Sequence, residues 1–295
     1  MKLATFTLKE DASQKIRIGI VLDDQTRIDE YNLPGIHDQA GVLAFLDFKK
    51  NNLDLSKPVA RYVMNDVTLK APIPRPRRNI FCVGKNYFEH AKEFSQSGFD
   101  SSAKAGEDIP SDPIVFSKVP ECVVATGDSI LIPRGISEAI DYEAELAVII
   151  GAGGKGISEK NAMSHVWGYT IINDVTARDW QHRHKQWHMG KSFDTFGPMG
   201  PYLVTADELD AQNTTVQCWV NGELRQNTNT TDLIFKIPKL IETISAGITL
   251  YPGDIIATGT PVGVGIGFKP PKYLVAGDIV KIAIGGIGAI ENPVL

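Results

Sequence analysis

Cysteine is scarce in this sequence of 295 residues, and its few copies form no pattern. Cys82, Cys122 and Cys218 lie far apart, and none belongs to a CxxC pair. An odd number of widely spaced cysteines argues against a disulfide framework. The three residues therefore indicate reduced thiols in a cytosolic protein.

Positive charge and long apolar runs are lacking as well. The formal net charge is −5 and the sequence pI is about 5.7, with no run of Lys and Arg, which argues against a nucleic-acid-binding surface. The opening residues MKLATFTLKEDASQK hold no apolar stretch of signal-peptide length, and no segment approaches the length of a membrane span. We expect a protein of the cytoplasm.

Strand-like segments outnumber helical ones. The predicted strands cover 2–8, 16–24, 79–84, 112–118, 129–134, 143–150, 168–176, 201–205, 215–225, 254–260 and 278–284. The predicted helices are fewer and cover 40–50, a stretch from near Tyr87, 159–163, 177–184 and 234–244. Strands without a helix between each pair argue against a doubly wound fold. The pattern predicts a β-rich α+β fold, with mixed sheets curled into a roll or barrel and helices at the periphery.

A proline-rich segment divides the chain. APIPRPRR, residues 71–78, contains three prolines and three arginines in eight residues and is expected to be extended. It predicts a boundary between a small N-terminal α+β domain, residues 1–70, and a catalytic domain, residues 71–295.

Acidic residues interrupt one of the most apolar strands, AIDYEAELAVII. Because side chains alternate along a strand, Asp141, Glu143 and Glu145 are expected to share one face, where like charges repel. Asp174, at the end of the strand GYTIIND, is a plausible third ligand beside the two glutamates. Three carboxylates suit Mg²⁺, Mn²⁺ or Ca²⁺. The alternative is an exposed sheet face on which acids alternate with core residues.

Histidines gather in QHRHKQWH, where His184 and His188 are four apart and would share a helical face. Zinc is conceivable there, but the HExxH arrangement is absent, and a polar surface that also includes His182 is the simpler interpretation.

A possible acid–base pair lies in GKNYFEHAKEF. His90 and Glu93 are three apart on a predicted helix, so the carboxylate can orient the imidazole. A surface pair is the alternative. The predicted helix continues into FSQSGFDSSAKAGEDIPSD, residues 94–112, which is rich in Ser, Gly and Asp.

Two further segments are ambiguous. ATGTPVGVGIG, residues 257–267, lacks both common phosphate-binding patterns and indicates either backbone brought close to a small ligand or tight turns. GKSFDTFGPMGP places Lys191 in a loop with several glycines and prolines, where a lone lysine usually faces solvent.

The order of these motifs is more specific than any one of them. GKNYFEHAKE, PIVFSK, DYEAELAVII, GYTIINDVTARDWQ, GKSFDTFGPMGP, VNGELRQ and PGDIIATGTPVGVG together resemble the fumarylacetoacetate hydrolase family, from about Ala71 to the C-terminus. The sequence is most similar to a bacterial branch with acylpyruvate hydrolases and oxaloacetate decarboxylases. The resemblance implies a roll-like β-barrel, a homodimer and one Mg²⁺ or Mn²⁺ per subunit.

The resemblance also implies roles for individual residues. It makes Glu143, Glu145 and Asp174 the metal ligands and leaves Asp141 outside the metal site. His90 and Glu93 match the acid–base dyad, and Lys191 matches a lysine at the substrate oxygens. Substrate contacts are implied for Lys118, Arg178, Gln181 and Thr260.

Such a site suits a small 2-oxo acid, whose carboxylate and ketone oxygens can chelate the metal and leave a metal-bound enolate when a neighbouring bond breaks. The first choice is a hydrolase that cleaves a C–C bond in a 2,4-dioxo acid of the acylpyruvate or fumarylpyruvate type. An oxaloacetate-type decarboxylase or an isomerase on the same site is the alternative, and a non-catalytic protein that binds metal and small acids is a third hypothesis.

The segment from about Tyr87 to Asp112 is expected to act as a lid that orders over the metal when a 2-oxo acid binds.

Overall fold

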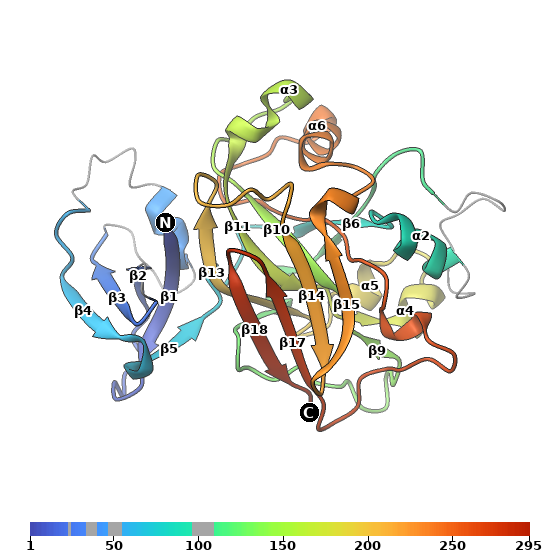
Figure 1. Cartoon of the computed structure of the whole chain (residues 1–295), viewed down its shortest axis with the longest axis horizontal. Helices are drawn as coiled ribbons and strands as arrows, with labels where there is room; N and C mark the ends of the chain where they lie inside the picture. Colours follow the sequence, from blue (N-terminus) through green and yellow to red (C-terminus); the bar gives the residue numbers. More distant parts are fainter. Residues whose placement is uncertain (23–24, 34–39, 47–54, 96–108) are drawn as a thin grey trace.

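The computed structural model describes residues 1–22, 25–33, 40–46, 55–95 and 109–295. Most of its regular structure is strand, and the helices lie at the periphery, so the predicted β-rich α+β fold is confirmed (Figure 1). No helix among these residues has the length and apolar character needed to cross a membrane.

The largest sheet has twelve strands. Its main path runs in the order β4-β3-β2-β1-β13-β11-β10-β16-β6-β7, with β5 paired to β1 and β8 paired to β13. The bounds of these strands are β1 Lys2–Leu8, β2 Arg17–Val21, β3 Arg27–Tyr31, β4 Ala60–Val63, β5 Val67–Lys70, β6 Ile80–Gly84, β7 Ile114–Lys118, β8 Val123–Val124, β10 Ala144–Ile150, β11 Val166–Asn173, β13 Gly197–Thr205 and β16 Ile255–Ala257. Since β6 and β16 run parallel while most neighbours run antiparallel, the sheet is mixed.

Two smaller sheets accompany it. One has four strands in the order β15-β14-β17-β18, and the other pairs β12 with β9. Their bounds are β9 Ile140–Asp141, β12 Thr176–Ala177, β14 Thr215–Val220, β15 Glu223–Asn229, β17 Ile279–Ile284 and β18 Gly288–Pro293. The four-stranded sheet lies across the face of β10, β11 and β13 (Figure 1).

The described α-helices are short. They are α2 Phe88–Ser95, α3 Glu159–Ala162, α4 Arg178–Arg183, α5 His188–Lys191 and α6 Ile237–Gly247. Helices α3 and α6 pack together at one end of the molecule, while α2, α4 and α5 lie on the side away from β1 to β5 (Figure 1).

Strand β10 is buried along its length, and its residues other than Glu145 are apolar, because both of its faces are covered. Leu146 and Val148 belong to the core between the two large sheets, whereas Ala147 and Ile149 belong to a second core that includes Leu43 and Ile80. Burial on both faces is what a continuous apolar run predicts. Glu145 is two residues before Ala147 and therefore lies on the same face of the strand, which points away from the four-stranded sheet.

The N-terminal strands join the large sheet directly. Leu3 of β1 pairs with Leu203 of β13, and β1 also pairs with β2 and β5. The segment 71–78 contains neither helix nor strand, as its prolines predict. The division into domains 1–70 and 71–295 remains a prediction.

Several predicted boundaries require correction. Residues 129–134 form no strand: Ile130 makes an isolated bridge to Val294, and Pro133, which has no amide hydrogen, precedes a turn. The helix expected at 234–244 begins at Ile237, with Pro238 in its first turn. The predicted helix 40–50 is described only to residue 46, as a 3₁₀ turn at Gly41–Leu43 and a short helical stretch, and its remainder lies outside the described residues.

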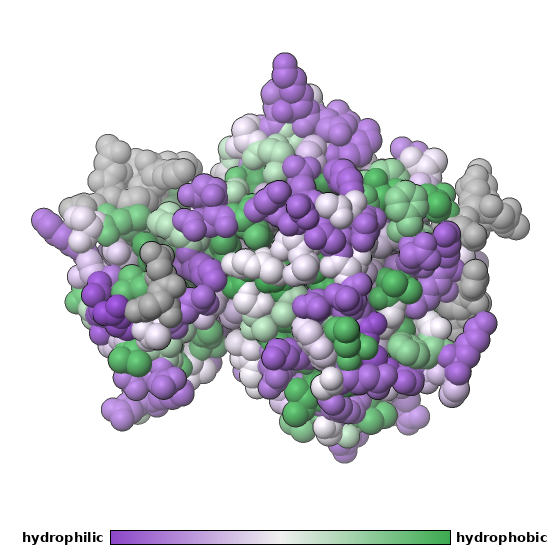
Figure 2. Space-filling model, in the orientation of Figure 1, coloured by the Kyte–Doolittle hydropathy of each residue, from purple (hydrophilic) through white to green (hydrophobic). Residues whose placement is uncertain are grey.

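On the face of the molecule drawn in Figure 2, hydrophobic residues are interspersed with hydrophilic ones. All three cysteines are free and buried, which agrees with the prediction of reduced thiols.

Candidate metal centre and active site

Three carboxylates meet where β10 and β11 lie side by side. Glu145 belongs to β10, Glu143 directly precedes that strand, and Asp174 directly follows β11. The antiparallel register pairs Ala144 with Asn173, and the Asp174 N–H donates to the Glu143 carbonyl at 2.9 Å. One oxygen from each of the three acids lies within 4.8 Å of the other two, and all three residues are buried. The predicted set of ligands is therefore assembled by strand pairing.

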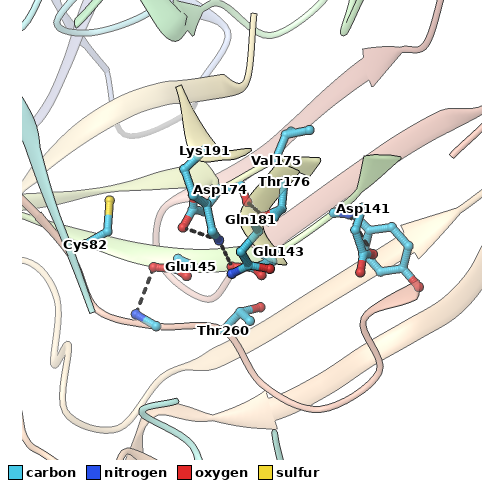
Figure 3. Close-up of polar contacts among 12 residues, drawn as sticks. Cys82, Asp141, Glu143, Glu145, Asp174, Val175, Thr176, Gln181, Lys191 and Thr260 are labelled. Atoms are coloured by element: carbon cyan, nitrogen blue, oxygen red, sulfur yellow. Dashed lines mark hydrogen bonds and ion pairs between the residues drawn. The ribbon is translucent and has the colours of Figure 1, made fainter. Parts of the chain in front are cut away.

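Buried cations surround these acids. The Lys191 Nζ lies 2.7 Å from Glu143 Oε2 and 2.8 Å from Asp174 Oδ2. The Lys118 Nζ lies 2.7 Å from Asp174 Oδ1, on another side of that carboxylate. Arg178 Nη1 lies 2.8 Å from Glu143 Oε1. Three buried cations therefore already offset part of the repulsion among the acids, and Figure 3 shows Lys191 beside Glu143 and Asp174.

The electrostatic environment differs among the acids. Burial opposes ionisation of Glu143, but Lys191 and Arg178 outweigh it and hold the pKa of this carboxyl below its ordinary value, at about 2. For Lys191, Asp174 and Glu143 outweigh burial and raise the pKa above its usual range. Both side chains are therefore charged at neutral pH.

Glu145 is the exception. Burial raises the pKa of Glu145 well above its ordinary value, and the charges of Asp174 and Glu143 raise it further. Its Oε2 accepts the Gly259 N–H at 2.8 Å, and no ion pair of Glu145 occurs in the part of the chain that the structure describes. A cation placed between the three acids would stabilise its ionised form.

The donor set fits a hard divalent cation. It offers three carboxylate oxygens and no thiolate or imidazole, as Mg²⁺ and Mn²⁺ prefer. Among the described residues it is the only group of at least three His, Cys, Asp or Glu side chains close enough to hold an ion. Glu145 is the strongest sign of fit, because burial, Asp174 and Glu143 together oppose its ionised form, which such an ion would stabilise.

Asp141 does not share the face of Glu143 and Glu145, contrary to the alternation expected. The strand is interrupted at Tyr142 and Glu143, between β9 and β10, so the period of two does not continue through these residues. Asp141 lies apart from the three acids in Figure 3. Its Oδ2 accepts from Arg178 Nε at 2.8 Å.

The predicted dyad forms on α2. His90 Nδ1 lies 3.1 Å from Glu93 Oε2, and both side chains are largely buried, so the surface-pair alternative was wrong. Since Glu93 engages Nδ1, the other ring nitrogen, Nε2, is left for a ligand. His90 lines the cavity above the acids, whereas Glu93 does not.

One cavity brings most of the predicted residues together. Its free volume in this structure is about 10 Å³, room for about one water molecule. Its lining consists of Val83, Gly84, Lys85, His90, Phe94, Phe116, Glu143, Glu145, Arg178, Gln181, Trp187, Lys191 and Thr260. The structure thus gathers His90, the two glutamates, Arg178, Gln181, Lys191 and Thr260 around one space.

Lys118 and Asp174 are not part of this lining. Lys118 is fully buried and lies behind Asp174, where its Nζ also donates to the carbonyls of Val175, at 3.1 Å, and Lys191. It therefore supports a carboxylate in this structure, and its predicted contact with substrate stays a prediction.

The aromatic part of the wall was not predicted. Trp187 packs edge to face on Phe94 and on Phe116, with its ring centroid 5.8 Å from that of Phe94 and 5.2 Å from that of Phe116. Lys191 lies on α5, a four-residue helix too short to leave a periodic signal, and it is 1% exposed although a lone lysine in a loop usually faces solvent.

The histidine pair does not form a zinc site. Helix α4 ends at Arg183 and α5 begins at His188, so His184 and His188 do not share one helical face as expected. His184 packs against Trp180, and His188 Nδ1 lies 2.9 Å from the Ser117 carbonyl.

Comparison with known proteins gives a consistent result. Residues 79–295 match the family model described as fumarylacetoacetate (FAA) hydrolase C-terminal. The chain is 50% identical over 234 residues to "Oxaloacetate tautomerase YisK" of Bacillus subtilis (strain 168), which covers 79% of this chain and 75% of that protein.

Solved structures also match the chain over its whole length. "Fumarylacetoacetate hydrolase (EaFAH)" from Exiguobacterium antarcticum has a TM-score of 0.82 and 38% identity, over 100% of this chain and 99% of that one. Maleylpyruvate hydrolase from Sphingobium sp. SYK-6, in complex with manganese(II) ion and pyruvate, has a TM-score of 0.78 and 29% identity, over 100% and 99% of the two chains.

Proposed function

The chain belongs to the fumarylacetoacetate hydrolase family, and from that premise we propose that it moves a proton at the carbon beside the ketone of a small 2-oxo acid, with keto–enol tautomerisation of oxaloacetate as its reaction. Members of this family are enzymes. The observation that carries the proposal is the position of His90, an oriented imidazole that lines the same cavity as Glu143, Glu145 and Lys191.

The proposed cofactor is one Mg²⁺ or Mn²⁺, held by Glu143, Glu145 and Asp174. When bound, it would supply positive charge that polarises the ketone and favours the enolate form of the substrate. Manganese in the maleylpyruvate hydrolase structure supports this assignment.

His90 is the proposed acid–base group. In the keto-to-enol direction, a proton leaves the carbon beside the ketone for His90 Nε2, the electron pair of that C–H bond forms the new C=C bond, and the π pair of the C=O bond moves to the ketone oxygen. The oxygen then takes the proton from the imidazolium, so protons and charge balance. Glu93, 3.1 Å from Nδ1, holds the ring in position and stabilises its protonated form.

Lys191 and Arg178 are proposed to stabilise the oxygen charges of the substrate. Both are cationic, buried and part of the cavity wall. In a site of low polarity, fixed cations at a developing oxyanion contribute more than they would in water. Gln181 and Thr260, on the same wall, are neutral hydrogen-bonding groups that suit the substrate carboxylates.

C–C bond hydrolysis of a 2,4-dioxo acid is the second candidate, and it was the first choice on sequence grounds. The maleylpyruvate hydrolase similarity favours it. For this reaction His90 would deprotonate a water that attacks the distal carbonyl, and cleavage would leave the same kind of enolate. Loss of CO₂ from oxaloacetate is a third outcome that this site chemistry allows.

We also propose a homodimer in the cytoplasm. The family resemblance supports the dimer, and three free cysteines are compatible with a reducing compartment. Size-exclusion chromatography with light scattering tests the dimer directly.

The reaction is tested with oxaloacetate and with a panel of acylpyruvates and maleylpyruvate, each assayed with Mg²⁺, Mn²⁺ or a chelator. We expect faster loss of the ultraviolet absorbance of enol oxaloacetate, with no CO₂ release and no effect in chelator. Cleavage of a dioxo acid without an effect on oxaloacetate would favour the hydrolase. No metal-dependent effect on any of these acids would contradict both functions.

A further inference from the structure

The glycine-rich segment 257–267, whose sequence allowed either a ligand cradle or tight turns, binds two side chains of the chain itself. The Gly263 N–H donates to the Glu93 carboxylate, at 3.1 Å to Oε1 and 3.3 Å to Oε2. The Gly265 N–H donates to Asp141 Oδ1 at 2.6 Å, and the Ile266 N–H donates to Asp141 Oδ2 at 3.0 Å. We call residues 263–267 the glycine clamp.

The close approach of these carboxylates explains the glycines. A Cβ on Gly265 would come within 2.4 Å of the Lys272 carbonyl oxygen and 2.7 Å of Asp141 Oδ1, and a Cβ on Gly267 would come within 2.0 Å of Glu93 Oε1. Real Cβ atoms do not approach so closely, so a larger residue at position 267 would displace the Glu93 carboxylate, and one at position 265 would disturb both Asp141 and the backbone at Lys272.

Asp141 links the clamp to the metal side of the site. Its Oδ2 accepts from Arg178 Nε at 2.8 Å, and Arg178 Nη1 lies 2.8 Å from Glu143 Oε1. Both Asp141 and Arg178 are at most 1% exposed. A continuous series of polar contacts thus runs from a proposed metal ligand, through Arg178 and Asp141, to the clamp.

The same series reaches the dyad at its other end. The clamp holds Glu93 through Gly263, and Glu93 contacts His90 Nδ1. The two halves of the active site, α2 and the acids at β10, are far apart in the sequence. Both are connected to the glycine clamp by these polar contacts.

We propose that Asp141 is a positioning residue, which fixes the glycine clamp and Arg178 together and so holds the His90–Glu93 dyad in place above Glu143. Asp141 touches neither the cavity nor the three acids directly, so its effect passes through Arg178 and the clamp. The catalytic part of this inference rests on the proposed function, whereas the positioning part does not.

Asparagine at position 141 tests the idea with little change in volume. Four donors face the carboxylate: the N–H groups of Tyr142, Gly265 and Ile266, and Arg178 Nε. Each oxygen accepts from two of them. In either orientation, an asparagine amide would point its NH₂ group at two donors, which breaks two of the contacts.

We expect Asp141→Asn to lower kcat about 10- to 100-fold, as misplacement of a reacting group does, with a smaller change in KM. Amide hydrogen exchange should become faster in residues 263–267 and in α2. The Mn²⁺ dissociation constant, measured by electron paramagnetic resonance, should change less than kcat. Gly267→Ala reaches the contact from the Glu93 side, and it should raise exchange in α2 even if Asp141→Asn does not fold.

Asp254→Asn is the matched control. Asp254 is also a buried acid that accepts from an arginine, Arg78 Nε at 2.7 Å, and from a backbone N–H, Tyr251 at 2.6 Å, but it lies outside the cavity wall. It should lower the melting temperature and leave kcat and exchange in the clamp unchanged.

The proposal would be overturned if amide hydrogen exchange in the clamp and in α2 were as slow in Asp141→Asn and Gly267→Ala as in the wild type. Equal losses of kcat in Asp141→Asn and Asp254→Asn would overturn it as well. A loss confined to Mn²⁺ affinity would do so as well. If oxaloacetate proves not to be a substrate, the exchange data and Mn²⁺ affinities still test the positioning role, so the two failures remain distinguishable.

Discussion

The ammonium of Lys191 lies 2.7 Å from the carboxylate of Glu143, and the same nitrogen is 2.8 Å from Asp174. If these acids hold a metal, the metal and the Lys191 ammonium both contact the carboxylates of Glu143 and Asp174. The lysine neutralises part of the negative charge and at the same time opposes the approach of a second cation. This relationship makes the lysine and the metal separable by mutation.

Lys191→Met is expected to lower activity strongly and to strengthen Mn²⁺ binding. Methionine keeps much of the side-chain volume but removes the positive charge that competes for Glu143 and Asp174. Without metal, the variant should be destabilised by up to about 3–5 kcal/mol, because two buried acids lose a partner. Titration calorimetry with Mn²⁺ and thermal unfolding in chelator measure the two effects, and weaker Mn²⁺ binding would contradict the competition.

Glu145→Gln should change stability in opposite directions with and without metal. In chelator, glutamine removes a buried acid whose ionised form is opposed by burial and by the charges of Asp174 and Glu143, so the melting temperature should stay equal or rise. With Mn²⁺ at about 100 times the dissociation constant, the wild type should gain about 2.7 kcal/mol. The variant should gain little, since loss of a ligand is expected to weaken binding by at least about 100-fold. Equal stabilisation of both proteins by Mn²⁺ would remove Glu145 from the ligand set.

His90→Ala should abolish most of the activity and leave Mn²⁺ affinity near that of the wild type, because His90 is not one of the three acids. Glu93→Gln should have a smaller effect in the same direction, since the amide still fills the space beside His90 Nδ1 but loses the charge. Glu89→Gln, on the same helix with its partner Lys92 at 3.2 Å, is the exposed control and should leave the rate unchanged. Steady-state kinetics and Mn²⁺ titration of each variant measure these effects. Full activity in His90→Ala would show that the assignment of His90 is wrong.

Helix α2 should gain protection against hydrogen exchange when Mn²⁺ and oxalate bind together. Oxalate resembles the carboxylate and ketone oxygens of a 2-oxo acid, and a ligand that also contacts His90 contributes binding energy that favours the closed position. The predicted lid covered about Tyr87 to Asp112, of which 96–108 lie outside the described residues. Equal protection of α2 with and without oxalate would show that it is a fixed part of the scaffold.

The cluster of three acids could be predicted because strand pairing is local and regular. A strand bearing Glu145 and a strand ending before Asp174 need only an antiparallel register to bring their acids together, and motif order supplied the rest. The dyad was similarly accessible, since a spacing of three on a helix is enough to pair His90 with Glu93.

The surroundings of the site could not be predicted from sequence periodicity. Asp141 left the expected face because the strand breaks at Tyr142, and its carboxylate instead accepts from the Gly265 N–H, in a loop more than a hundred residues later in the chain. Lys118 and Arg178 became counter-charges through tertiary contacts, which no local pattern reports. The cavity wall of Phe94, Phe116 and Trp187 arises in the same way, from three separate elements.

The central claim is that one divalent cation binds between Glu143, Glu145 and Asp174. Anomalous scattering from crystals soaked in Mn²⁺ tests it most directly, because the signal locates manganese independently of any assay. The account predicts one strong peak per subunit among the three carboxylates, and its loss in Glu145→Gln. A peak beside His184 and His188, with none at the three acids, would contradict it.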